Sequence, residues 1–331
     1  MKKDIQLCGL GNALVDLQYE IKEDHLTVLG LNKGEMLLVD ENKQAMVLEQ
    51  FKDFRQVRCS GGSAANTVIA FSALGGKSAY MTVLGKDSFG DFYSDEFREL
   101  GIELAAPQLE SSPTGTCIIF ITPDSERTMH TALAATAQFG SHNINDELIK
   151  RSEWLYIEGY KFSEPSGTEA VYKSLDIAKA NNTKVAVTFS DVFITNIFKD
   201  NLKKVAENSD LIFCNEFEAM AYTGKETIES AYKALCEISP NVVLTKGPRG
   251  SNIRWNGEDL EVQAYEAALK DTTGAGDMFA GAFLYGMTEY NDPLIAGNLA
   301  SFFGAKIVSQ FGARLNQDPI KLKNELLEKL K

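Results

Sequence analysis

The second half of the chain alternates short apolar runs with segments of helical spacing, and this alternation constrains the fold more than any other feature. The apolar runs, rich in Val, Ile, Leu and aromatic residues, are expected to form buried strands at residues 154–157, 185–189, 211–214 and 242–245. Helices are expected between them at residues 168–180, 194–206 and 231–238. Because parallel strands need crossover connections, the pattern predicts an α/β fold with a doubly wound, mainly parallel sheet flanked by helices.

Polar and glycine residues follow each of the four predicted strands. They are Glu158-Gly159, Ser190-Asp191, Asn215-Glu216 and Lys246-Gly247. In open parallel sheets the ligand crevice lies at the carboxyl ends of the strands, so these clusters favour a single binding site at that edge. The alternative for each cluster is an ordinary polar, glycine-rich loop.

The first half of the chain has a different pattern. Strand-like runs occur at residues 13–21, 36–39, 116–122 and 128–134, and the last two are joined by a predicted hairpin turn at 123–126. Helical patterns at residues 61–74 and 89–100 return to the main body. We therefore expect one chain in which a small β-strand lid, formed by about residues 13–40 and 104–135, closes on a large α/β domain made by the remainder.

Composition narrows the expected partners and location. The 331 residues carry a formal net charge of -13, and a field of that sign repels nucleic-acid phosphates and anionic lipids, so neither is an expected partner. The five cysteines contain no CxxC pair, which predicts free thiols of a reducing compartment rather than a zinc site or a disulfide framework. No apolar run reaches the length of a membrane span, and we expect a cytoplasmic protein.

The segment Asp271-Thr272-Thr273-Gly274-Ala275-Gly276-Asp277 carries the strongest chemical signal. It precedes a helical run at residues 278–285, and small residues before a helix leave backbone N–H groups open at the positive end of the helix dipole. Such a place suits the charge on a transferring phosphoryl group, and the Asp277 carboxylate could accept a proton from an attacking hydroxyl. The competing interpretation is a glycine-rich turn with Asp277 as a capping residue.

Four motifs, in this order, resemble the ribokinase family of carbohydrate and nucleoside kinases. They are Gly61-Gly62-Ser63-Ala64-Ala65-Asn66, Asn215-Glu216-Phe217-Glu218, Thr245-Lys246-Gly247 followed by Gly250, and the segment 271–277. The resemblance runs over about residues 5–315. It implies a ribokinase-like fold and a kinase that uses ATP and Mg²⁺, and it raises a monovalent cation such as K⁺ as a further cofactor.

The resemblance also implies a role for each matching residue. Asp277 would be the catalytic base, and the backbone N–H groups of Gly274, Ala275 and Gly276 would form an anion hole. The residues implied to bind the acceptor are Asn12, Asp16, Gly61, Gly62, Asn66 and Tyr160. Those implied to bind the nucleotide are Asn215, Thr245, Lys246, Gly247, Gly250, Thr272 and Asn298, with Asn215 and Glu218 organising Mg²⁺. Simpler roles stay open, because Asn66 could bond locally, Glu218 could be a first-turn helix charge and Asp16 a solvent-facing strand residue.

Arg127 lies at the predicted lid hairpin. Closure of the lid could bring this arginine to the transferring phosphate, and the lid strands would exclude the water that competes as an acceptor. The alternative is a solvated turn arginine without a catalytic role.

Several segments are similar to the adenosine kinases of this family, notably Ser112-Pro113-Thr114-Gly115-Thr116-Cys117 and residues 127–135. Adenosine kinases usually carry consecutive aromatic residues after a Glu-Gly pair, one of which stacks on the base. Here Lys161 stands between Tyr160 and Phe162, so Phe120, Tyr160 or Phe162 would have to supply the stacking ring. The lysine could instead meet a more polar sugar or an acidic group, or point to solvent.

These observations leave three hypotheses for function. The first is a kinase that phosphorylates a primary hydroxyl of a nucleoside, adenosine preferred, and gives the 5′-monophosphate. The second is a sugar kinase of the same fold with a ribose- or fructose-like acceptor. The third is a catalytically silent family member that binds a ligand. In each case the expected partner is a small molecule, and the chain is expected to be a monomer or a homodimer.

Overall fold

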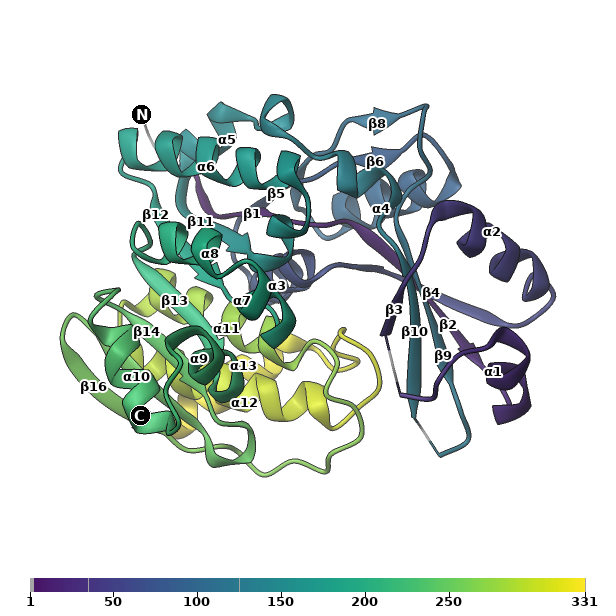
Figure 1. Ribbon diagram of the computed structural model, residues 1–331. Helices are drawn as coiled ribbons and strands as arrows, with labels where there is room; N and C mark the ends of the chain where they lie inside the picture. Colours follow the sequence, from purple (N-terminus) through teal and green to yellow (C-terminus); the bar gives the residue numbers. More distant parts are fainter. Residues whose placement is uncertain (1–2, 35, 125, 331) are drawn as a thin grey trace.

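The structure is a computed structural model that describes residues 3–34, 36–124 and 126–330. The largest of its sheets, which we call the large sheet, has nine described strands (Figure 1). In spatial order they are β16 (Glu258–Val262), β15 (Ser251–Trp255), β14 (Val242–Thr245), β13 (Leu211–Asn215), β12 (Lys184–Thr188), β11 (Ser152–Glu158), β1 (Ile5–Leu10), β5 (Ser78–Met81) and β7 (Glu103–Ala105). All neighbours from β14 to β7 are parallel, whereas β15 and β16 add an antiparallel hairpin at one edge. The predicted mainly parallel sheet is confirmed.

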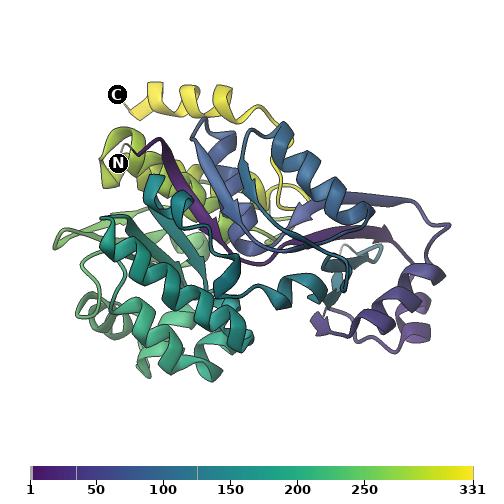
Figure 2. The same ribbon diagram turned by 90° about the horizontal axis from the view of Figure 1, so that it is seen from above.

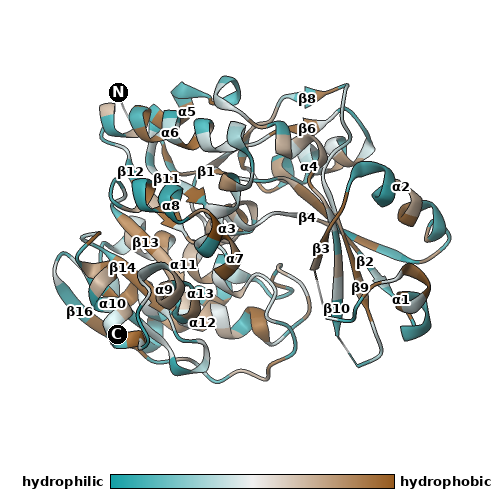
Figure 3. Cartoon of the chain, in the orientation of Figure 1, coloured by the Kyte–Doolittle hydropathy of each residue, from teal (hydrophilic) through white to brown (hydrophobic). Residues whose placement is uncertain are grey.

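Helices cover both faces of the large sheet (Figure 2). One face carries α3 (Ser63–Ala73), α4 (Ser88–Glu99), α11 (Ala275–Tyr290), α12 (Pro293–Val308) and α13 (Pro319–Leu330). The other face carries α5 (Asp146–Arg151), α6 (Pro165–Ala180), α7 (Val192–Ile197), α8 (Lys199–Ala206), α9 (Glu216–Thr223) and α10 (Ile228–Cys236). The apolar strands of the sheet lie between these two layers, and polar residues predominate on the outer surfaces of the helices (Figure 3).

Strand β11 shows why the core divides into two layers. Trp154 and Tyr156 point into the layer that contains α11 and α12, whereas Leu155 and Ile157 point into the layer that contains α6. Successive side chains of a strand face opposite sides, so a strand with both faces covered needs a continuous apolar run. This is the physical reason that the runs in the second half of the chain predict the sheet correctly.

The second sheet, which we call the small sheet, stands beside the large body together with two helices (Figure 1). Its strands are, in order, β3 (Met36–Leu38), β10 (Arg127–Ala132), β9 (Thr116–Ile121), β2 (Leu14–Glu20) and β4 (Gln56–Gly61), and its helices are α1 (Glu23–Leu29) and α2 (Glu41–Gln50). A further pair of short strands, β6 (Leu84–Gly85) and β8 (Gln108–Leu109), lies between the two bodies.

The small sheet differs in two places from the ranges 13–40 and 104–135 expected for a lid. Strand β4 belongs to the small sheet through its antiparallel pairing with β2, although it lies outside both ranges. Strand β7 pairs with β5 in the large sheet, although its end falls within the second range. The sequence of β4 is mostly polar, with Val57 and Arg58 exposed and Ser60 and Gly61 buried, so no apolar run marks it as a strand. The hairpin between β9 and β10 is present, but Ser125 of its predicted turn lies outside the described residues.

Two expected helices differ from the observed ones. The helix expected at 194–206 is divided into α7 and α8 at Phe198, whose φ of -108° and ψ of 32° are not helical. The helix expected at 278–285 is longer, because α11 begins at Ala275 and continues to Tyr290. None of the described helices is both long and apolar enough to cross a membrane.

Helices α3 and α11 pack unusually closely, and this contact determines how their first turns meet. A side-chain carbon at Gly281 of α11 would lie 2.5 Å from the carbonyl oxygen of Thr67 and 2.8 Å from Cβ of Ala70. Only a glycine allows the two backbones to approach to this distance. The first turns of both helices therefore come together at the carboxyl end of the large sheet.

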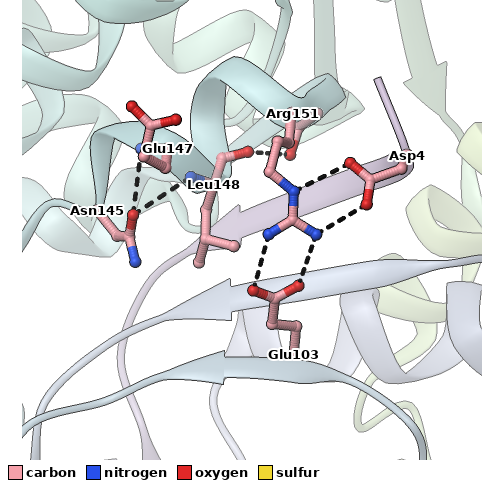
Figure 4. Close-up of polar contacts among 7 residues, drawn as sticks. Asp4, Glu103, Asn145, Glu147, Leu148 and Arg151 are labelled. Atoms are coloured by element: carbon pink, nitrogen blue, oxygen red, sulfur yellow. Dashed lines mark hydrogen bonds and ion pairs between the residues drawn. The ribbon is translucent and has the colours of Figure 1, made fainter. Parts of the chain in front are cut away.

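The opposite end of the large sheet is tied together by Arg151 (Figure 4). Its guanidinium donates to both carboxylate oxygens of Asp4, at 3.0 and 2.9 Å, and to both of Glu103, each at 3.1 Å. Arg151 directly precedes β11, Asp4 directly precedes β1, and Glu103 is the first residue of β7. The cluster therefore joins the amino ends of three strands. Forked pairing of this kind is directional, but all three side chains are partly exposed, which limits its contribution to stability.

Candidate active site

The carboxyl ends of the large-sheet strands lie in register. Glu158 at the end of β11 pairs with Thr188 of β12, and Asn215 at the end of β13 pairs with Thr245 of β14. The polar clusters after these strands therefore reach the same edge of the sheet. The loop after β1 reaches it as well, because the backbone N–H of Asn12 donates to Glu158 Oε1 at 2.7 Å.

Asp277 lies in the first turn of α11 and faces the first turn of α3. Ser63 Oγ donates to its Oδ1 at 2.7 Å, and Asn66 Nδ2 donates to its Oδ2 at 3.0 Å. Burial raises the pKa of Asp277 to about 6, while the hydrogen bonds from Ser63 and Asn66 and the charge of Arg314 act in the opposite direction. The carboxylate is thus held in one orientation and can exchange a proton near neutral pH.

Two of these contact residues were not predicted as site residues. Ser63 stands inside the glycine motif 61–66, so the motif itself was the available signal. Arg314 lies in the irregular segment after α12, 248 residues from the Asn66 side chain to which its Nη1 donates at 2.6 Å. No local pattern around Arg314 points to this contact, because the partners meet only in the folded chain.

Asp16 of β2 packs against Gly61 of β4. A side-chain carbon at Gly61 would lie 2.4 Å from Asp16 Oδ1, so the missing side chain is what makes room for the carboxylate. Burial raises the pKa of Asp16 to about 7, the charges of Arg314 and Arg127 oppose this, and the charge of Asp277 adds to it. The two aspartates therefore belong to one electrostatic site, with Gly62 beside it against the Asn12 carbonyl.

Lys161 is almost completely buried beneath the site and does not point to solvent. Its Nζ donates to Asn12 Oδ1 at 2.9 Å and to the Thr136 carbonyl at 3.1 Å, and it lies over the Phe139 ring. Burial lowers the pKa of Lys161 and raises that of Glu158, whose carboxylate accepts from the Asn12 and Ala64 N–H groups. Lys161 and Glu158 together fix the position of Asn12, one of the residues predicted to bind the acceptor substrate.

The aromatic residues beside Lys161 divide into an inner and an outer one. Phe162 is 2% exposed and belongs to the core. Tyr160 is partly exposed, its hydroxyl donates to the Ser190 carbonyl at 3.4 Å, and burial raises its pKa well above the usual range. Of the three aromatic residues that could supply a stacking ring, Phe120 and Phe162 are buried, and only Tyr160 keeps accessible surface.

Arg127 connects the small sheet to the segment that precedes α11. Its Nη1 donates to Asp271 Oδ2, and the Asp271 carboxylate also accepts from the N–H groups of Thr273 at 2.9 Å and Gly312 at 2.8 Å. Although burial alone would raise it, the pKa of Asp271 is lowered by these hydrogen bonds and by the Arg127 charge. Arg127 Nε and Nη2 are buried without a partner among the described residues, so the guanidinium retains two donors.

The turn before α11 uses one of the three N–H groups predicted for the anion hole. Gly274, with φ of 72°, is the N-cap residue, and the Ala275 N–H donates to the Thr272 carbonyl at 3.1 Å. Gly276 and Asp277 follow in the first helical turn, where N–H groups have no partner within the helix. The first helical hydrogen bond runs from Met278 N–H to the Gly274 carbonyl, so the N–H groups of Gly276 and Asp277 lie ahead of the helical hydrogen bonds.

Asn215 and Glu218 form a reciprocal capping box at the start of α9. Asn215 Oδ1 accepts from the Phe217 and Glu218 N–H groups, and the Glu218 carboxylate accepts from Asn215 N–H and Nδ2 at 3.0 and 2.6 Å. Burial raises the pKa of Glu218 to about 7, and the charges of Asp191 and Asp277 raise it further. Glu218 therefore does serve as a first-turn helix residue, the simpler role left open by the sequence. Its carboxylate is also close enough to Asp277 for the charge of Asp277 to raise its pKa.

The remaining residues predicted to bind nucleotide lie around the turn after β14 and beside α12. Lys246 Nζ donates to Glu261 Oε1 of β16 at 2.7 Å, so the glutamate partly neutralises the lysine charge. Asn298 of α12 accepts from the Tyr265 hydroxyl at 3.2 Å. The others are at the surface or in the turn: Thr245, Gly247, Gly250 and Thr272. Thr245, Lys246, Gly247 and Gly250 lie at the end of β14 and in the turn after it, next to Asn215 of β13, whereas Thr272 follows Asp271 in the segment before α11.

Comparison with known proteins places the chain in a family. The model of the pfkB family carbohydrate kinases matches residues 37–320. The chain therefore belongs to the pfkB family of carbohydrate kinases, and the resemblance seen in its motifs is confirmed. Members of this family phosphorylate hydroxyl groups, so the chain is a phosphotransferase with an alcohol group as acceptor. Kinases of this family use ATP, generally with Mg²⁺.

Individual relatives carry two kinds of name. An adenosine kinase of Saccharomyces cerevisiae is 26% identical over 327 residues, covering 92% of this chain and 95% of that protein. A 5-dehydro-2-deoxygluconokinase of Clostridium botulinum is 27% identical over 290 residues, covering 82% and 84%. Among solved structures, adenosine kinase from Sinorhizobium meliloti has a TM-score of 0.88 at 27% identity, covering 97% of this chain and 99% of that one. A probable sugar kinase from Rhizobium etli also has a TM-score of 0.88, at 26% identity, covering 98% and 99%.

Proposed function

We propose that the chain transfers the γ-phosphate of ATP to a primary hydroxyl of a nucleoside, with adenosine preferred, and releases the 5′-monophosphate. The observation that carries this proposal is the position of Asp277. Its carboxylate is oriented by Ser63 and Asn66 where two helices begin, and Asp16 approaches the same space from the small sheet. A pKa of about 6 leaves Asp277 ionised, and therefore basic, at neutral pH.

Phosphoryl transfer needs alignment, proton removal and charge stabilisation more than any other chemistry. Asp277 takes the proton of the acceptor hydroxyl as its oxygen attacks the γ-phosphate. The open N–H groups of Gly276 and Asp277, at the positive end of α11, stabilise the charge on the transferred group. Asp16, Gly61, Gly62 and Asn66 position the acceptor so that one hydroxyl meets Asp277.

The residues around Glu218 fit a site for Mg²⁺ held through water. The Glu218 carboxylate is 5% exposed and carries a raised pKa, so a nearby divalent cation would relieve the cost of its charge. Because Asn215 occupies both carboxylate oxygens, water would form the direct contacts, which suits an ion that keeps several waters. Bound Mg²⁺ would neutralise charge on the ATP phosphates.

Arg127 supports a closing role for the small sheet. The arginine is buried at the boundary of the two bodies, and its Nε and Nη2 have no partner within the described part of the chain. We propose that these donors meet a phosphate oxygen when ATP is bound, and that the small sheet then acts as a lid that excludes water from the reacting groups.

Two arguments support adenosine as the acceptor. The chain is similar to proteins named adenosine kinase along nearly its whole length, both in sequence and in structure. At the site itself, Lys161 and Thr136 hold the Asn12 amide oxygen, which leaves the Asn12 NH₂ group to donate to an acceptor oxygen or ring nitrogen. Tyr160 offers a partly exposed ring at the same edge.

A sugar kinase acting on a ribose- or fructose-like acceptor is the second candidate, and one observation favours it. Lys161 is buried and stands where adenosine kinases usually carry the second of two consecutive aromatic residues after the Glu-Gly pair, so this chain has only Tyr160 at these two positions. An acceptor without a base would not need the second aromatic residue. The chain is also similar to proteins named 5-dehydro-2-deoxygluconokinase.

The experiment that decides between these candidates is a coupled ADP-release assay with purified protein, ATP and Mg²⁺. Adenosine, other nucleosides, ribose, fructose and sugar acids are offered in parallel, and product is identified by mass. We expect the highest kcat/KM with adenosine. Turnover of sugars without any nucleoside would overturn the first candidate in favour of the second, and no turnover with any acceptor would favour a ligand-binding role. Replacing K⁺ by a bulky organic cation in the same assay tests for a monovalent-cation requirement.

A further inference from the structure

We infer that Arg314 is a positioning residue for the transfer step, because its guanidinium holds the Asn66 amide in the orientation that donates to Asp277. The inference rests on the proposed function, since it gives Asp277 the role of base. It adds a residue that neither the motifs of the sequence nor the family resemblance assigns to the site.

The contact has a direction that follows from the chemistry of its groups. Arg314 Nη1 donates to Asn66 Oδ1 at 2.6 Å, and Asn66 Nδ2 donates to Asp277 Oδ2 at 3.0 Å. An amide has nearly the same shape when its oxygen and nitrogen are exchanged, so shape alone does not fix its orientation. A guanidinium has donors only, and therefore only the oxygen end of Asn66 can face it.

Arg314 itself is fixed by a second contact. Its Nη2 donates to the carbonyl oxygen of Ser60 on β4. Ser60 is completely buried, and both its N–H and its hydroxyl donate to Glu96 Oε2, at 2.7 and 2.6 Å. The guanidinium thus spans from β4 of the small sheet to the first turn of α3, so it is held at both ends by contacts outside the irregular segment that carries it.

Charge gives the same residue a second effect on Asp277. Burial raises the pKa of Asp277, and the charge of Arg314 lowers it. Burial also raises the pKa of Asp16, and there the charge of Arg314 has the larger opposing effect and that of Arg127 the smaller. The charge of Asp277 also raises the pKa of the nearby carboxyl groups and tyrosines, none of which is a cation. These groups are Asp16, Glu158, Glu218, Tyr80, Tyr156 and Tyr160. Removal of Arg314 therefore leaves Asp277 among carboxylates without its cation, and the pKa of Asp277 rises.

A purely structural role for Arg314, as a strap between the C-terminal segment and β4, makes different predictions. Loss of a strap lowers thermal stability and lowers activity at every pH. Loss of the positioning contact lowers kcat most at low pH, and it moves the acid limb of the pH profile upward. The KM for ATP stays unchanged in the second case, because Arg314 donates to Asn66 and Ser60, whereas most of the predicted nucleotide-binding residues lie at the ends of β13 and β14.

The test measures kcat, both KM values and the pH dependence of kcat/KM for the parent, Arg314→Ala, Arg314→Lys, Asn66→Ala and the double variant Asn66→Ala/Arg314→Ala. Arg151→Ala serves as the matched control, since Arg151 also joins distant segments through a forked guanidinium but at the far end of the sheet. We expect Arg314→Ala to lower kcat on the order of 10- to 100-fold, as for a small misplacement of reacting groups. The acid limb should move to higher pH, and at a pH above that limb the double variant should be no slower than Asn66→Ala.

Two additional measurements keep the inference testable if Arg314→Ala folds poorly. Arg314→Lys retains the charge but not the fork, so its acid limb should stay near that of the parent while kcat still falls. Added guanidinium ion should restore part of the activity of Arg314→Ala and none of that of Arg151→Ala. An acid limb that stays in place in Arg314→Ala, or additive losses in the double variant, would overturn the inference.

The failure of the proposed function gives a separate result. If Asp277→Asn retains the activity of the parent, Asp277 is not the base, and the inference fails together with the proposal. If Asp277→Asn is inactive while Arg314→Ala behaves like Arg151→Ala, the proposed function stands and the positioning role alone is wrong.

Discussion

Arg127 and Asp271 form a buried ion pair between the small sheet and the segment that leads into α11. The side chains are 9% and 4% exposed, and Asp271 also accepts from the backbone N–H groups of Thr273 and Gly312. One carboxylate therefore connects the small sheet, the turn before α11 and the C-terminal segment. The relative position of these three elements determines whether Asp16 and Asp277 face the same acceptor.

Arg127→Ala should reduce both stability and turnover. Removing one partner of a buried pair leaves the other charge uncompensated, which costs about 3–5 kcal/mol. We expect a lower melting temperature and a kcat reduced on the order of 10², because the small sheet loses its contact with the turn before α11. Differential scanning calorimetry and steady-state kinetics check both effects. A variant with the parent's kcat would show that Arg127 has no part in closure.

Asp16→Asn should change how the stability of the unliganded protein depends on pH. The pKa of Asp16 is raised by burial from its usual value to about 7, so the folded state binds this proton more tightly than the unfolded state does. Its contribution to stability is present below the unfolded-state pKa and is lost as the pH rises through about 7. Relative to the parent, the variant should therefore be more stable at pH 8 than at pH 5.

The control for this experiment is Asp259→Asn. Asp259 accepts from Arg254, and that hydrogen bond lowers the pKa of Asp259, so the sign of its linkage is opposite. Thermal melts of both variants across the same pH range should diverge. Parallel curves for the two variants would contradict the assignment of Asp16 as a buried, easily protonated group.

Lys161→Met should impair acceptor binding more than ATP binding. The substitution removes the charge that holds the Asn12 amide oxygen and compensates the buried Glu158 carboxylate, while keeping a long apolar side chain. We expect the KM for the acceptor to rise on the order of 10-fold and the KM for ATP to stay near that of the parent, since a lost hydrogen bond to a charged group is worth about 1.5–3 kcal/mol. An equal rise in both KM values would show that the Lys161 network serves general stability only.

Gly281→Ala should separate the first turns of α3 and α11. The added carbon would lie 2.5 Å from the Thr67 carbonyl oxygen, and overpacking of this kind costs about 1–3 kcal/mol. Because Asn66 and Asp277 lie at the starts of the two helices, we expect a loss of kcat in addition to a lower melting temperature. Gly276→Ala is the matched comparison for packing, since a side-chain carbon there meets no atom within 4 Å.

The sequence predicted the parallel strands β11 to β14 of the large sheet, because strands covered on both faces need continuous apolar runs such as Leu155 to Ile157, but it did not predict β1, β5, β7, β15 or β16. It predicted less of the small sheet, where β4 is polar and pairs on one side only. The carboxyl-edge position of Asn215 and Glu158 followed from strand order alone. The contact of Arg314 with Asn66 could not be predicted, since it joins an irregular segment to a helix 248 residues away.

Lys161 shows a different limit of sequence reasoning. A lysine between two aromatic residues is compatible with solvent exposure, with a ligand contact or with burial, and composition does not distinguish these cases. Burial is decided by the Thr136 carbonyl, Asn12 Oδ1 and the Phe139 ring, which come from other parts of the chain.

The central claim is that Asp277 is the base in phosphoryl transfer to an alcohol, and Asp277→Asn tests it most directly. The variant keeps the size of the side chain and can still accept from Ser63, but an amide does not take up the hydroxyl proton. With the best acceptor of the parent, transfer of radiolabelled γ-phosphate and ATP binding by calorimetry are measured side by side. The account predicts a kcat lower by a factor on the order of 10² or more, with the Kd for ATP unchanged. A kcat within a few-fold of the parent would contradict it.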